Sequence, residues 1–510
     1  MENSAIGAIG ANGAPGSEGE AVPPTGLVSG TTVNDLLNDA PMSRFHRRTV
    51  VISGMGFFTD AYDLFVISTV AVLVKTQWHL STSQTSWVAG STILGAFVGA
   101  FLFGRIADVL GRKSVYALVA VIMILGALSS AFANGLTWLV VTRFVLGLGI
   151  GGDYPVSAVL MSEYANRDDR GRLVGLVFSM QAVGLIVGPL VGLVLLSSGI
   201  GDNLTWRLLL GLGAVPAAAV VYLRAKMPES PRFQASVQGK ADQAARELAR
   251  FSEGVIDAPH NPVATASIPR VPLRRQLTDR RILMLLLGTA GTWFLFDYAY
   301  YGNTLSLPAI LSNVAPHATL MTKLAWSLGL FAVFAVPGYL LAFMKMDRIG
   351  HRRLQLIGFG VMAGAFLILG AIPVLTNLVA PFLVIFGLSY FFIEFGPNTT
   401  TFVLPSELFP VSMRTTGHGI SAGIGKLGAF IGVFLVPALQ TAIGLRGLLL
   451  VASGSAVLGY LLTLLLPEPA RRTLEEVSGE DRPAELSDYR SIDVDPRETQ
   501  NPQPVANAAS

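Results

Sequence analysis

The chain has no cysteine and little charge for its size. Of its 510 residues, 14% are charged and 52% are hydrophobic. Without cysteine there is no disulfide, no thiolate metal site and no cysteine nucleophile. Soluble domains carry about a quarter charged residues, so the composition excludes an ordinary water-soluble domain. The sequence also lacks an H-E-x-x-H metal motif and an evident nucleophile with its base, and we predict neither an enzyme nor a bound cofactor or metal.

Long apolar runs take the place of the missing charge. A helix that crosses a bilayer needs about 20 mostly apolar residues. Twelve such runs occur, six on each side of a polar stretch at 224–281. They cover residues 49–74, 87–106, 114–132, 137–161, 172–196, 205–223, 282–302, 324–345, 354–375, 380–404, 415–441 and 448–466. The pattern predicts an all-α integral membrane protein with twelve transmembrane helices.

The chain divides into five parts by composition. Residues 1–40 are rich in Gly, Ala, Ser and Pro and lack the apolar run of a signal peptide, so we predict a disordered tail there and another at 477–510. Between the tails we predict a six-helix bundle at 41–224, a central loop at 225–281 and a second six-helix bundle at 282–476.

Basic residues gather at alternate ends of the predicted helices. They precede the first helix, follow the even-numbered helices and crowd the central stretch, whereas the opposite loops contain only Lys75, Arg207, Lys323 and Arg446. By the positive-inside rule, both termini and the central loop are expected to be cytoplasmic, in a plasma or inner membrane. Since topology explains these basic residues, nucleic acid is not an expected partner.

The two halves share landmarks about 240 residues apart. Asp108-Val-Leu-Gly111-Arg112-Lys113 matches Asp347-Arg-Ile-Gly350-His351-Arg352, Ser162-Glu163 matches Ser406-Glu407, and Pro228-Glu229 matches Pro467-Glu468. A duplicated six-helix unit of this kind places its solute site near mid-membrane, between the halves. The acidic and basic residues at the helix ends predict salt bridges that close one face and break when it opens. These gating residues are Asp108, Arg112, Glu163, Arg170, Asp347, Glu407 and Arg414.

Eight ionisable side chains lie within or at the edges of the apolar runs. A charge at the bilayer centre costs about 2.5–3.5 kcal/mol on insertion scales, so such residues face a protein interior and serve a function there. They are Asp60, Asp63, Arg143, Asp153, Glu163, Asp297, Glu394 and Lys426. This set predicts a transporter.

Asp60 and Asp63 stand three residues apart and therefore share one helix face. Two close carboxylates in a dry setting repel, and one of them is expected to hold a proton near neutral pH. We predict that the pair takes part in proton coupling. The alternative is that one of them pairs with Arg143 or Lys426 and only braces the bundle.

A glycine cluster precedes Asp153 in the fourth apolar run. Its glycines satisfy the dinucleotide pattern G-x-G-x-x-G, but no strand precedes them, and glycines in a membrane helix predict a close approach of another helix. Asp153 lies at this tightly packed place, with the Tyr154 hydroxyl beside it and Pro155 next. It is the residue that we most expect to carry a proton.

Three more stretches suit a polar solute. Trp293, Asp297 and Tyr301 recur every four residues and so form one stripe on a helix. Gly396-Pro397 interrupts the tenth run, as happens where backbone lines a cavity, and Asn398 beside it offers a donor and an acceptor. The amide of Gln181 in the fifth run serves either the solute or a neighbouring helix, and Glu394 and the tails receive no role.

Several motifs resemble a known family. Gly104-Arg-Ile-Ala-Asp108-Val-Leu-Gly111-Arg112-Lys113 resembles the loop motif of the major facilitator superfamily, and Pro228-Glu229-Ser230-Pro231-Arg232 its sugar-porter-like branch. Gly56-Phe-Phe-Thr-Asp60-Ala-Tyr-Asp63, Gly151-Gly152-Asp153-Tyr154-Pro155, Gly396-Pro397-Asn398 and Gly425-Lys426-Leu-Gly428 resemble the phosphate:proton symporter family. The similarity extends over residues 47–475.

The resemblance implies the major facilitator fold, with two pseudo-symmetric six-helix bundles. By matching positions, it implies that phosphate is bound by Tyr154, Gln181, Trp293, Asp297, Tyr301 and Asn398. It further implies that protons are handled by Asp60, Asp63 and Asp153, with Arg143 or Lys426 as cationic partners. Dihydrogen phosphate suits this set because its oxygens accept hydrogen bonds and its P–OH groups can donate to Asp297, which sulfate cannot do.

We therefore expect a monomeric proton-coupled phosphate importer in the lipid bilayer that works by alternating access. Protonation of Asp153, helped by the Asp60/Asp63 pair, is expected to permit phosphate binding from outside. The alternative solutes are a sugar or an organic acid such as an aromatic carboxylate, because the same amides and Trp293 suit them. A non-transporting membrane receptor is the alternative of another class, and proton-coupled flux in liposomes separates the two.

Overall fold

The structure is a computed structural model that describes residues 33–39, 42–251 and 272–480, and every regular element in these ranges is a helix. The first half begins with the long helix α2 (Arg44–Gln77). It continues with α3 (Thr82–Leu110), α4 (Arg112–Ala131), α5 (Leu136–Tyr164), α6 (Arg170–Ser179) with α7 (Gln181–Ser197), and α8 (Asp202–Leu212) with α9 (Ala214–Ala225). These elements form six crossings, as the apolar runs predicted.

The second half begins with α13 (Arg280–Leu305) and the short helix α14 (Leu307–Val314). It continues with α15 (Leu320–Leu330), the π-helical turn η1 (Phe331–Ala335) and α16 (Val336–Ile349), then α17 (His351–Ala371), the 3-10 turn η2 (Pro373–Thr376), α18 (Val379–Ile393), the π-helical turn η3 (Glu394–Asn398), α19 (Thr399–Leu408) and α20 (Arg414–Thr463). Each turn η1 and η3 joins two helices into one crossing.

The helix α20 contains two crossings. Eleven helical stretches in the described residues are long and apolar enough to span a membrane, and α20, with 50 residues, is the longest. Gly444 interrupts it with φ 70° and ψ 175°, a conformation that glycine adopts without steric cost. Before this break α20 runs parallel to α13, with Gly425 against Trp293 and Gly432 against Tyr298, and after it Leu462 lies beside Gly291. The predicted twelve-helix membrane fold is therefore confirmed.

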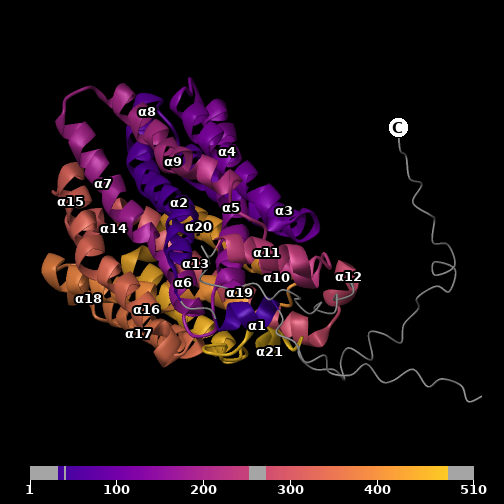
Figure 1. The fold of residues 1–510 in the computed structure, drawn as a ribbon. Coiled ribbons are helices and arrows are strands. Elements are labelled where there is room, and N and C mark those ends of the chain that lie inside the picture. Colours follow the sequence, from indigo (N-terminus) through magenta and orange to yellow (C-terminus); the bar gives the residue numbers. More distant parts are fainter. Residues whose placement is uncertain (1–32, 40–41, 252–271, 481–510) are drawn as a thin grey trace, which may run out of the picture.

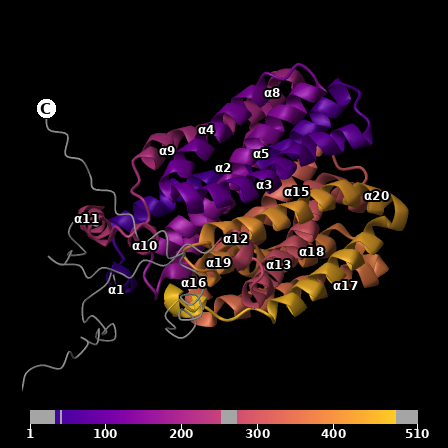
Figure 2. The same ribbon diagram turned by 90° about the vertical axis from the view of Figure 1, so that its right-hand side faces the viewer.

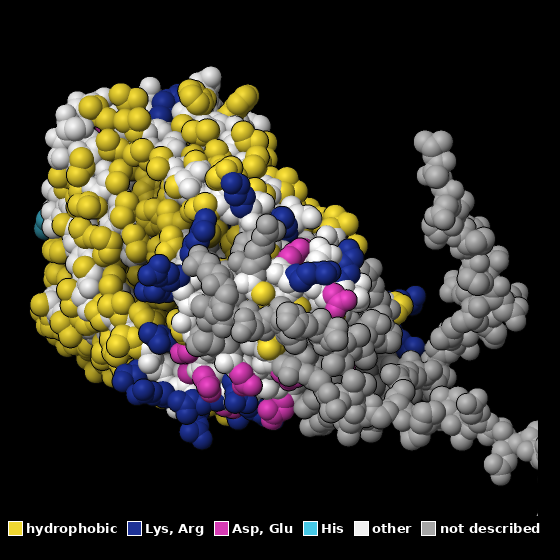
Figure 3. Space-filling view, in the orientation of Figure 1, with side chains coloured by type: hydrophobic (Ala, Val, Ile, Leu, Met, Phe, Trp, Pro, Cys, Tyr) yellow, Lys and Arg dark blue, Asp and Glu magenta, His cyan; other side chains and the backbone are white. Residues whose placement is uncertain are grey.

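The two halves lie side by side. Figures 1 and 2 show the indigo and magenta helices on one side and the orange and yellow helices on the other. Across the boundary α3 packs on α20 and α6 packs on α16. Apolar side chains cover most of the visible outer surface of both bundles, and the Lys, Arg, Asp and Glu side chains gather at one end (Figure 3). An apolar belt of this kind matches the hydrocarbon core of a bilayer.

We call the charged end, which carries α1 (Val33–Asn38), α10 (Pro231–Ser236), α11 (Ala241–Phe251) and α21 (Leu474–Ser478), the charged face. The other end, where residues 78–81 join α2 to α3, is the opposite face. On the charged face, Val33 and Leu37 of α1 are buried against α10 and α11. The prediction of a disordered tail was therefore wrong for residues 33–39, because two apolar side chains one turn apart dock there. Helices α10, α11 and α12 (Leu273–Gln276) also lie within the predicted central loop. The remaining tail residues lie outside the described ranges, apart from 477–478, which end α21, and 479–480, which follow it.

The glycine cluster of the fourth run packs helix on helix, as predicted. A Cβ atom on Gly151 would come within 2.0 Å of the Ala96 carbonyl oxygen of α3, and one on Gly147 within 2.0 Å of that of Thr92. The backbones of α3 and α5 therefore touch directly. Their contact fixes α5, which carries three of the eight ionisable residues (Arg143, Asp153 and Glu163), within the first half.

Candidate functional site

A polar cluster in the first half is centred on Asp60 of α2. The Tyr154 hydroxyl of α5 donates a hydrogen bond to the Asp60 carboxylate. The Gln181 amide, at the start of α7, donates to Asp60 Oδ2 at 3.1 Å and to the Tyr154 oxygen at 3.1 Å. All three side chains are buried. Tyr154 and Gln181, which donate to Asp60, are thus both neutral.

Tyr339 continues this cluster into the second half. Its hydroxyl, on α16, donates to Gln181 Oε1 at 2.9 Å and accepts from the Asn398 amide at 2.8 Å. The same Asn398 amide donates to the Glu394 carboxylate of η3. Sequence reasoning missed Tyr339, although it is a phenol in mid-helix, two residues after Pro337. The structure therefore brings Tyr154, Gln181 and Asn398 together through a residue that the motifs did not point to.

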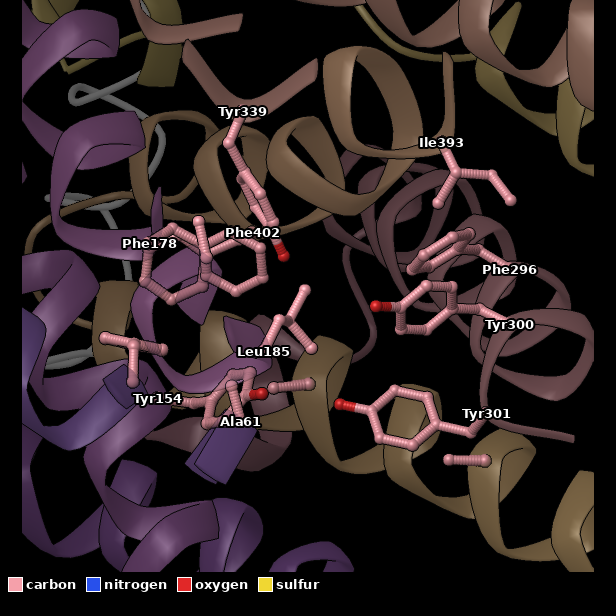
Figure 4. Packing of buried hydrophobic residues seen from close by; sticks show 14 of the residues in the cluster. Ala61, Tyr154, Phe178, Leu185, Phe296, Tyr300, Tyr301, Tyr339, Ile393 and Phe402 are labelled. Carbon is pink, nitrogen blue, oxygen red and sulfur yellow. The ribbon is translucent and has the colours of Figure 1, made fainter. Parts of the chain in front are cut away.

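A second polar group belongs to α13 and α20. The Lys426 ammonium donates to Asp297 Oδ2 at 3.3 Å and to the Tyr301 hydroxyl at 2.6 Å, and it lies 4.6 Å from the ring centre of Tyr154. The rings of Trp293 and Tyr154 are 6.0 Å apart between centres. In Figure 4 the hydroxyl groups of Tyr154, Tyr300, Tyr301 and Tyr339 point toward one another between the two halves, in a region that we call the central space. All six predicted solute-binding residues thus lie at or beside this space.

Asp63 and Arg143 form an ion pair inside the first half. Arg143 Nη2 donates to Asp63 Oδ2 at 2.7 Å, and Nη1 bonds the other carboxylate oxygen, so the pair is bidentate. Both residues are buried. The two aspartates of α2 therefore differ in their partners, and the bracing alternative describes Asp63. Its predicted part in proton coupling stays untested.

Asp153 lies apart from the central space. Arg224 of α9 bonds both of its carboxylate oxygens, one of them at 3.1 Å, and Ser157 donates to it at 3.1 Å. Arg224 also lies 4.3 Å from the ring centre of Tyr116. Arg224, which was counted in the polar stretch 224–281, is a buried residue in the last turn of α9. Because Arg224 bonds both oxygens of Asp153, it favours the charged form of this carboxylate and opposes the predicted proton role.

The gating residues meet across the charged face in a reciprocal arrangement. Asp108 of the first half accepts hydrogen bonds from the backbone of Thr415 and Thr416, at 3.3 and 2.6 Å, at the start of α20. Asp347 of the second half accepts from the backbone of Gly171 and Arg172, at 3.1 and 2.7 Å, at the start of α6. Each half thus caps a helix of the other, where a negative charge stabilises the helix N-terminus.

Further contacts across the halves close the same face. Arg112 bonds the Val411 carbonyl at 3.0 Å, and Arg414 bonds Glu163 Oε1 at 3.2 Å. Glu163 also accepts from Arg112 at 3.2 Å. The Ser162 hydroxyl donates to the Ser406 carbonyl at 3.0 Å. The predicted gating residues therefore join the two halves on the charged face, and the breaking of these bonds on opening stays a prediction.

The second-half repeat uses histidine where the first uses arginine. His351 Nδ1 lies 2.9 Å from Glu407, and Nε2 lies 3.1 Å from Asp347. Arg170 completes the group through a bond of 3.0 Å to the carbonyl oxygen of Arg472. All seven predicted gating residues therefore take part in bonds on the charged face.

Two glutamates cap helices within their own halves. Glu229 accepts from the backbone of Arg112 and Lys113 at the start of α4, at 2.9 and 3.3 Å. Glu468 accepts from His351 and Arg352 at the start of α17, at 2.7 and 3.1 Å. Burial raises the pKa of Glu229 above its usual value, although the backbone bonds act in the other direction. The Pro-Glu repeat is thus explained by helix capping.

A cavity of about 250 Å³ lies between the halves toward the opposite face. We call it the vestibule. It is lined by Ser68, Ala71, Val72, Lys75, Thr82, Thr85, Ser86, Ala89, Leu305, Ser306, Ala309, Val433 and Pro437. The vestibule thus lies on the side of the boundary away from the bonds that close the charged face. Within the described residues no group of three or more His, Cys, Asp or Glu side chains is arranged to hold a metal ion.

Comparison with known proteins gives concordant results. The family model described as sugar (and other) transporter matches residues 49–480. Inorganic phosphate transporter 1-11 of Oryza sativa subsp. japonica is 36% identical over 506 residues, which cover 89% of this chain and 91% of that protein. Low affinity inorganic phosphate transporter 4 of Medicago truncatula is 36% identical over 513 residues, covering 90% and 96%.

Solved structures share the architecture. The proton:xylose symporter XylE of the major facilitator superfamily, bound to 6-bromo-6-deoxy-D-glucose, is 20% identical with a TM-score of 0.73, covering 86% of this chain and 99% of that one. A double tryptophan mutant of XylE is 22% identical with a TM-score of 0.71, covering 86% and 99%. At these identities the likeness concerns the fold alone.

Proposed function

Because the chain belongs to the sugar (and other) transporter family, we propose that it imports inorganic phosphate together with protons by alternating access. One observation carries the proposal: the central donors and the Lys426–Asp297 pair lie between the halves of a chain that is 36% identical, over nearly its whole length, to proteins named inorganic phosphate transporters. Transport, and not catalysis, is the activity of such a chain.

The chemistry of the central space suits dihydrogen phosphate. Lys426 supplies a positive charge that the Asp297 carboxylate and the Tyr301 hydroxyl already hold in place. Tyr154, Gln181 and Asn398 can turn their donors toward an anion, and Asp297 can accept a hydrogen bond from P–OH. Sulfate lacks that proton and would set its charge against Asp297, so the site rejects it.

Asp60 is the better first proton carrier of the buried aspartates. Asp63, Asp153 and Asp297 each have a lysine or arginine partner within ion-pair distance. A carboxylate with a bonded cation resists protonation, whereas Asp60, which accepts from Tyr154 and Gln181, can gain a proton without leaving a buried cation alone. We therefore transfer the coupling role that the sequence suggested for Asp153 to Asp60.

The charged face is the cytoplasmic face in this proposal, in agreement with the positive-inside rule, and the vestibule opens outside. Phosphate and protons reach the centre through the vestibule, and the halves then rock about the site and break the reciprocal caps. Each charge that moves across the membrane exchanges about 2.3 kcal/mol per 100 mV. Protons that accompany the anion offset the opposing membrane potential.

Reconstituted liposomes test the proposal. With an imposed pH gradient, acid outside, we expect the purified protein to accumulate labelled phosphate, with competition by arsenate but not by sulfate, glucose or benzoate. Uptake of labelled glucose or benzoate, without phosphate uptake, would replace phosphate with a sugar or an organic acid. Binding of a solute without flux of any of them, whatever the pH gradient, would favour a receptor.

A residue-specific variant separates the site from the fold. Asp297→Asn should abolish phosphate uptake because Lys426 loses its counter-charge and the P–OH group of phosphate loses its charged acceptor. The matched control is Asp202→Asn, since Asp202 is exposed at the start of α8 and far from the site. Unchanged uptake and sulfate rejection in Asp297→Asn would refute its role.

A further inference from the structure

Glu394 is a buried acid that the proposed cycle does not use. It lies in η3, at 0% exposure, and the neutral Asn398 amide donates a hydrogen bond to one of its oxygens, Oε2. Its other oxygen, Oε1, has no hydrogen-bond partner among the described residues. A charged carboxylate so placed costs several kcal/mol, and a buried group of this kind takes up a proton instead.

The surroundings of Glu394 supply no positive charge within the described residues. The titratable groups that interact with it are the phenols of Tyr339 from α16, Tyr300 from α13 and Tyr390 from α18. From α17, the glycine Gly358 packs on the same turn. Phenols are neutral near pH 7, so no neighbouring charge stabilises an ionised Glu394.

The backbone just after Glu394 contains a helix break, which we call the joint. Gly396 departs from helical geometry, with φ −113° and ψ −106°, and Pro397 follows it. Side-chain hydroxyl groups bond carbonyl oxygens on both sides of the break, since Thr399 donates to the Glu394 carbonyl at 2.7 Å and Thr401 to that of Pro397 at 2.7 Å. A satisfied break in a membrane helix can persist and can flex, because no backbone bond must be lost first.

A continuous chain of hydrogen bonds joins this joint to the first half. It runs from Glu394 through Asn398, Tyr339 and Gln181 to Asp60. Glu394, Asn398 and Tyr339 belong to one half, and Gln181 and Asp60 to the other. Rocking of the halves must therefore change the chain at the Tyr339–Gln181 bond. The protonation states of its two terminal acids are thereby tied to the same movement.

We propose that Glu394 is a second proton-carrying residue, so that each phosphate is accompanied by at least two protons. The inference rests on the proposed phosphate symport. Glu394 takes one H⁺ from water on the vestibule side, crosses the cycle as a neutral acid and releases that H⁺ on the cytoplasmic side, and Asp60 does the same. With one dihydrogen phosphate anion the net movement is one positive charge inward, so the membrane potential drives uptake.

The limiting accumulation of phosphate at zero membrane potential tests this assignment. Each coupled proton multiplies the accumulation ratio tenfold per unit of pH gradient, because a tenfold ratio is worth about 1.4 kcal/mol. Potassium and valinomycin hold the potential at zero. We expect about 100-fold accumulation per pH unit in the wild type and about tenfold in Glu394→Gln, which keeps the shape but cannot ionise.

Exchange of internal for external phosphate controls for folding, since exchange moves no net proton. Glu394→Gln should keep exchange within about threefold of the wild type, which a variant with a merely damaged helix break would not. Equal accumulation ratios in the variant and the wild type would overturn the inference, as would a wild-type ratio of tenfold per pH unit, which needs no variant. Absence of any phosphate accumulation in the wild type would instead refute the proposed function.

Discussion

Buried carboxylates in this protein differ in what neutralises them. Asp63, Asp153 and Asp297 lie against Arg143, Arg224 and Lys426. Asp60 and Glu394 lie against amide and hydroxyl donors. An ion pair in an apolar interior is costly to break but not to replace as a whole, whereas a carboxylate with neutral partners can change its charge alone. Carboxylates of the first class therefore resist a change of charge, whereas those of the second can exchange protons.

The bracing role of the Asp63–Arg143 pair predicts a rescue. Arg143→Gln leaves Asp63 charged and alone, and we expect it to lose about 3–5 kcal/mol of stability. The double variant Asp63→Asn/Arg143→Gln should regain most of that loss, because no charge is then buried. Thermal unfolding of the purified proteins in detergent measures both. Equal destabilisation in the single and the double variant would contradict the assignment.

Asp60 and Asp153 should respond differently to the same substitution. Asp60→Asn is expected to lower the accumulation of phosphate per unit of pH gradient by about tenfold while phosphate exchange persists, because one coupled proton is lost. Asp153→Asn leaves Arg224 unpaired and should chiefly lower the thermal unfolding temperature. Liposome flux and unfolding, measured on both variants, give the comparison. A loss of coupling in Asp153→Asn with unchanged stability would return the proton role to Asp153.

The sequence alone identifies most of the residues at the centre but not their partners. Polar side chains are rare within apolar membrane-spanning runs, so Asp60, Gln181, Asp297 and Asn398 can be recognised in the sequence as candidate site residues. Their pairing depends on how each helix is rotated about its axis, which small packing differences decide. Tyr339 and Arg224 were missed for that reason, since a tyrosine in a helix and an arginine at a helix end are both common in membrane proteins.

Reciprocal capping is the central device at the level of elements. Asp108 caps α20 and Asp347 caps α6, so each half stabilises a helix start of the other. Separation of the halves exposes both helix N-termini together with both carboxylates. The cost of opening the charged face is therefore divided between two equivalent sites. Such a division follows from the duplicated sequence.

Removal of one reciprocal cap should favour opening of the charged face. A carboxylate at a helix N-terminus contributes roughly 1 kcal/mol, which is about a fivefold change in the population of the open form. Since the chain contains no cysteine, a single cysteine at Thr399, which faces Gly175 across the boundary of the halves, can report the opening. Asp108→Asn and Asp347→Asn should each raise the maleimide labelling rate of Thr399→Cys about fivefold.

Glu229→Gln is the matched control for these labelling experiments. Glu229 caps α4, which belongs to its own half, so its loss should leave the boundary between the halves unchanged. A labelling rate that rises equally in Glu229→Gln and Asp108→Asn would attribute the effect to general loosening and not to the gate.

Helix number was predictable, whereas helix breaks were only partly so. Spans of about 20 apolar residues follow from bilayer thickness, and their count was correct. Gly396-Pro397 signalled the break at η3, but η1 at Phe331–Ala335 has no proline or glycine within it and depends on packing. The docking of α1 likewise depends on a surface made by α10 and α11 that no local pattern describes.

The whole molecule joins its halves through the polar segments of the charged face as well as through the gate. Arg232 of α10, which follows the first bundle, bonds the Glu163 carbonyl at 3.1 Å, Asn38 of α1 at 2.8 Å and the Glu475 carboxylate of α21. One guanidinium thus contacts the end of the first bundle, the N-terminal segment and the segment after the last crossing. The duplication predicted two bundles, but nothing in it required this tie between them.

The pKa of Glu475 makes this tie sensitive to acid. Burial disfavours the charged form, but the positive charges of Arg232, Arg414 and Arg170, together with a backbone hydrogen bond, outweigh burial and lower the pKa of Glu475 from 4.5 to about 2. Because the folded-state pKa lies below the unfolded value, the stabilisation is fully present above about pH 4.5 and disappears as the pH falls toward 2. Arg232 would then lose one of its charged partners at the junction of the two halves.

Glu475→Gln should therefore lower the stability by roughly 1–3 kcal/mol at pH 7, and the difference from the wild type should shrink between pH 4.5 and pH 3. Thermal unfolding in detergent over this range measures the difference directly. The exposed pair Arg472–Glu476 offers a control in the same helix, since an exposed ion pair contributes little and Glu476→Gln should change the stability by less than about 1 kcal/mol at any pH. A difference in stability between Glu475→Gln and the wild type that stays constant down to pH 3 would mean that the charge of Glu475 does not contribute. The ion pair between α10 and α21 would then not help to hold the two halves together.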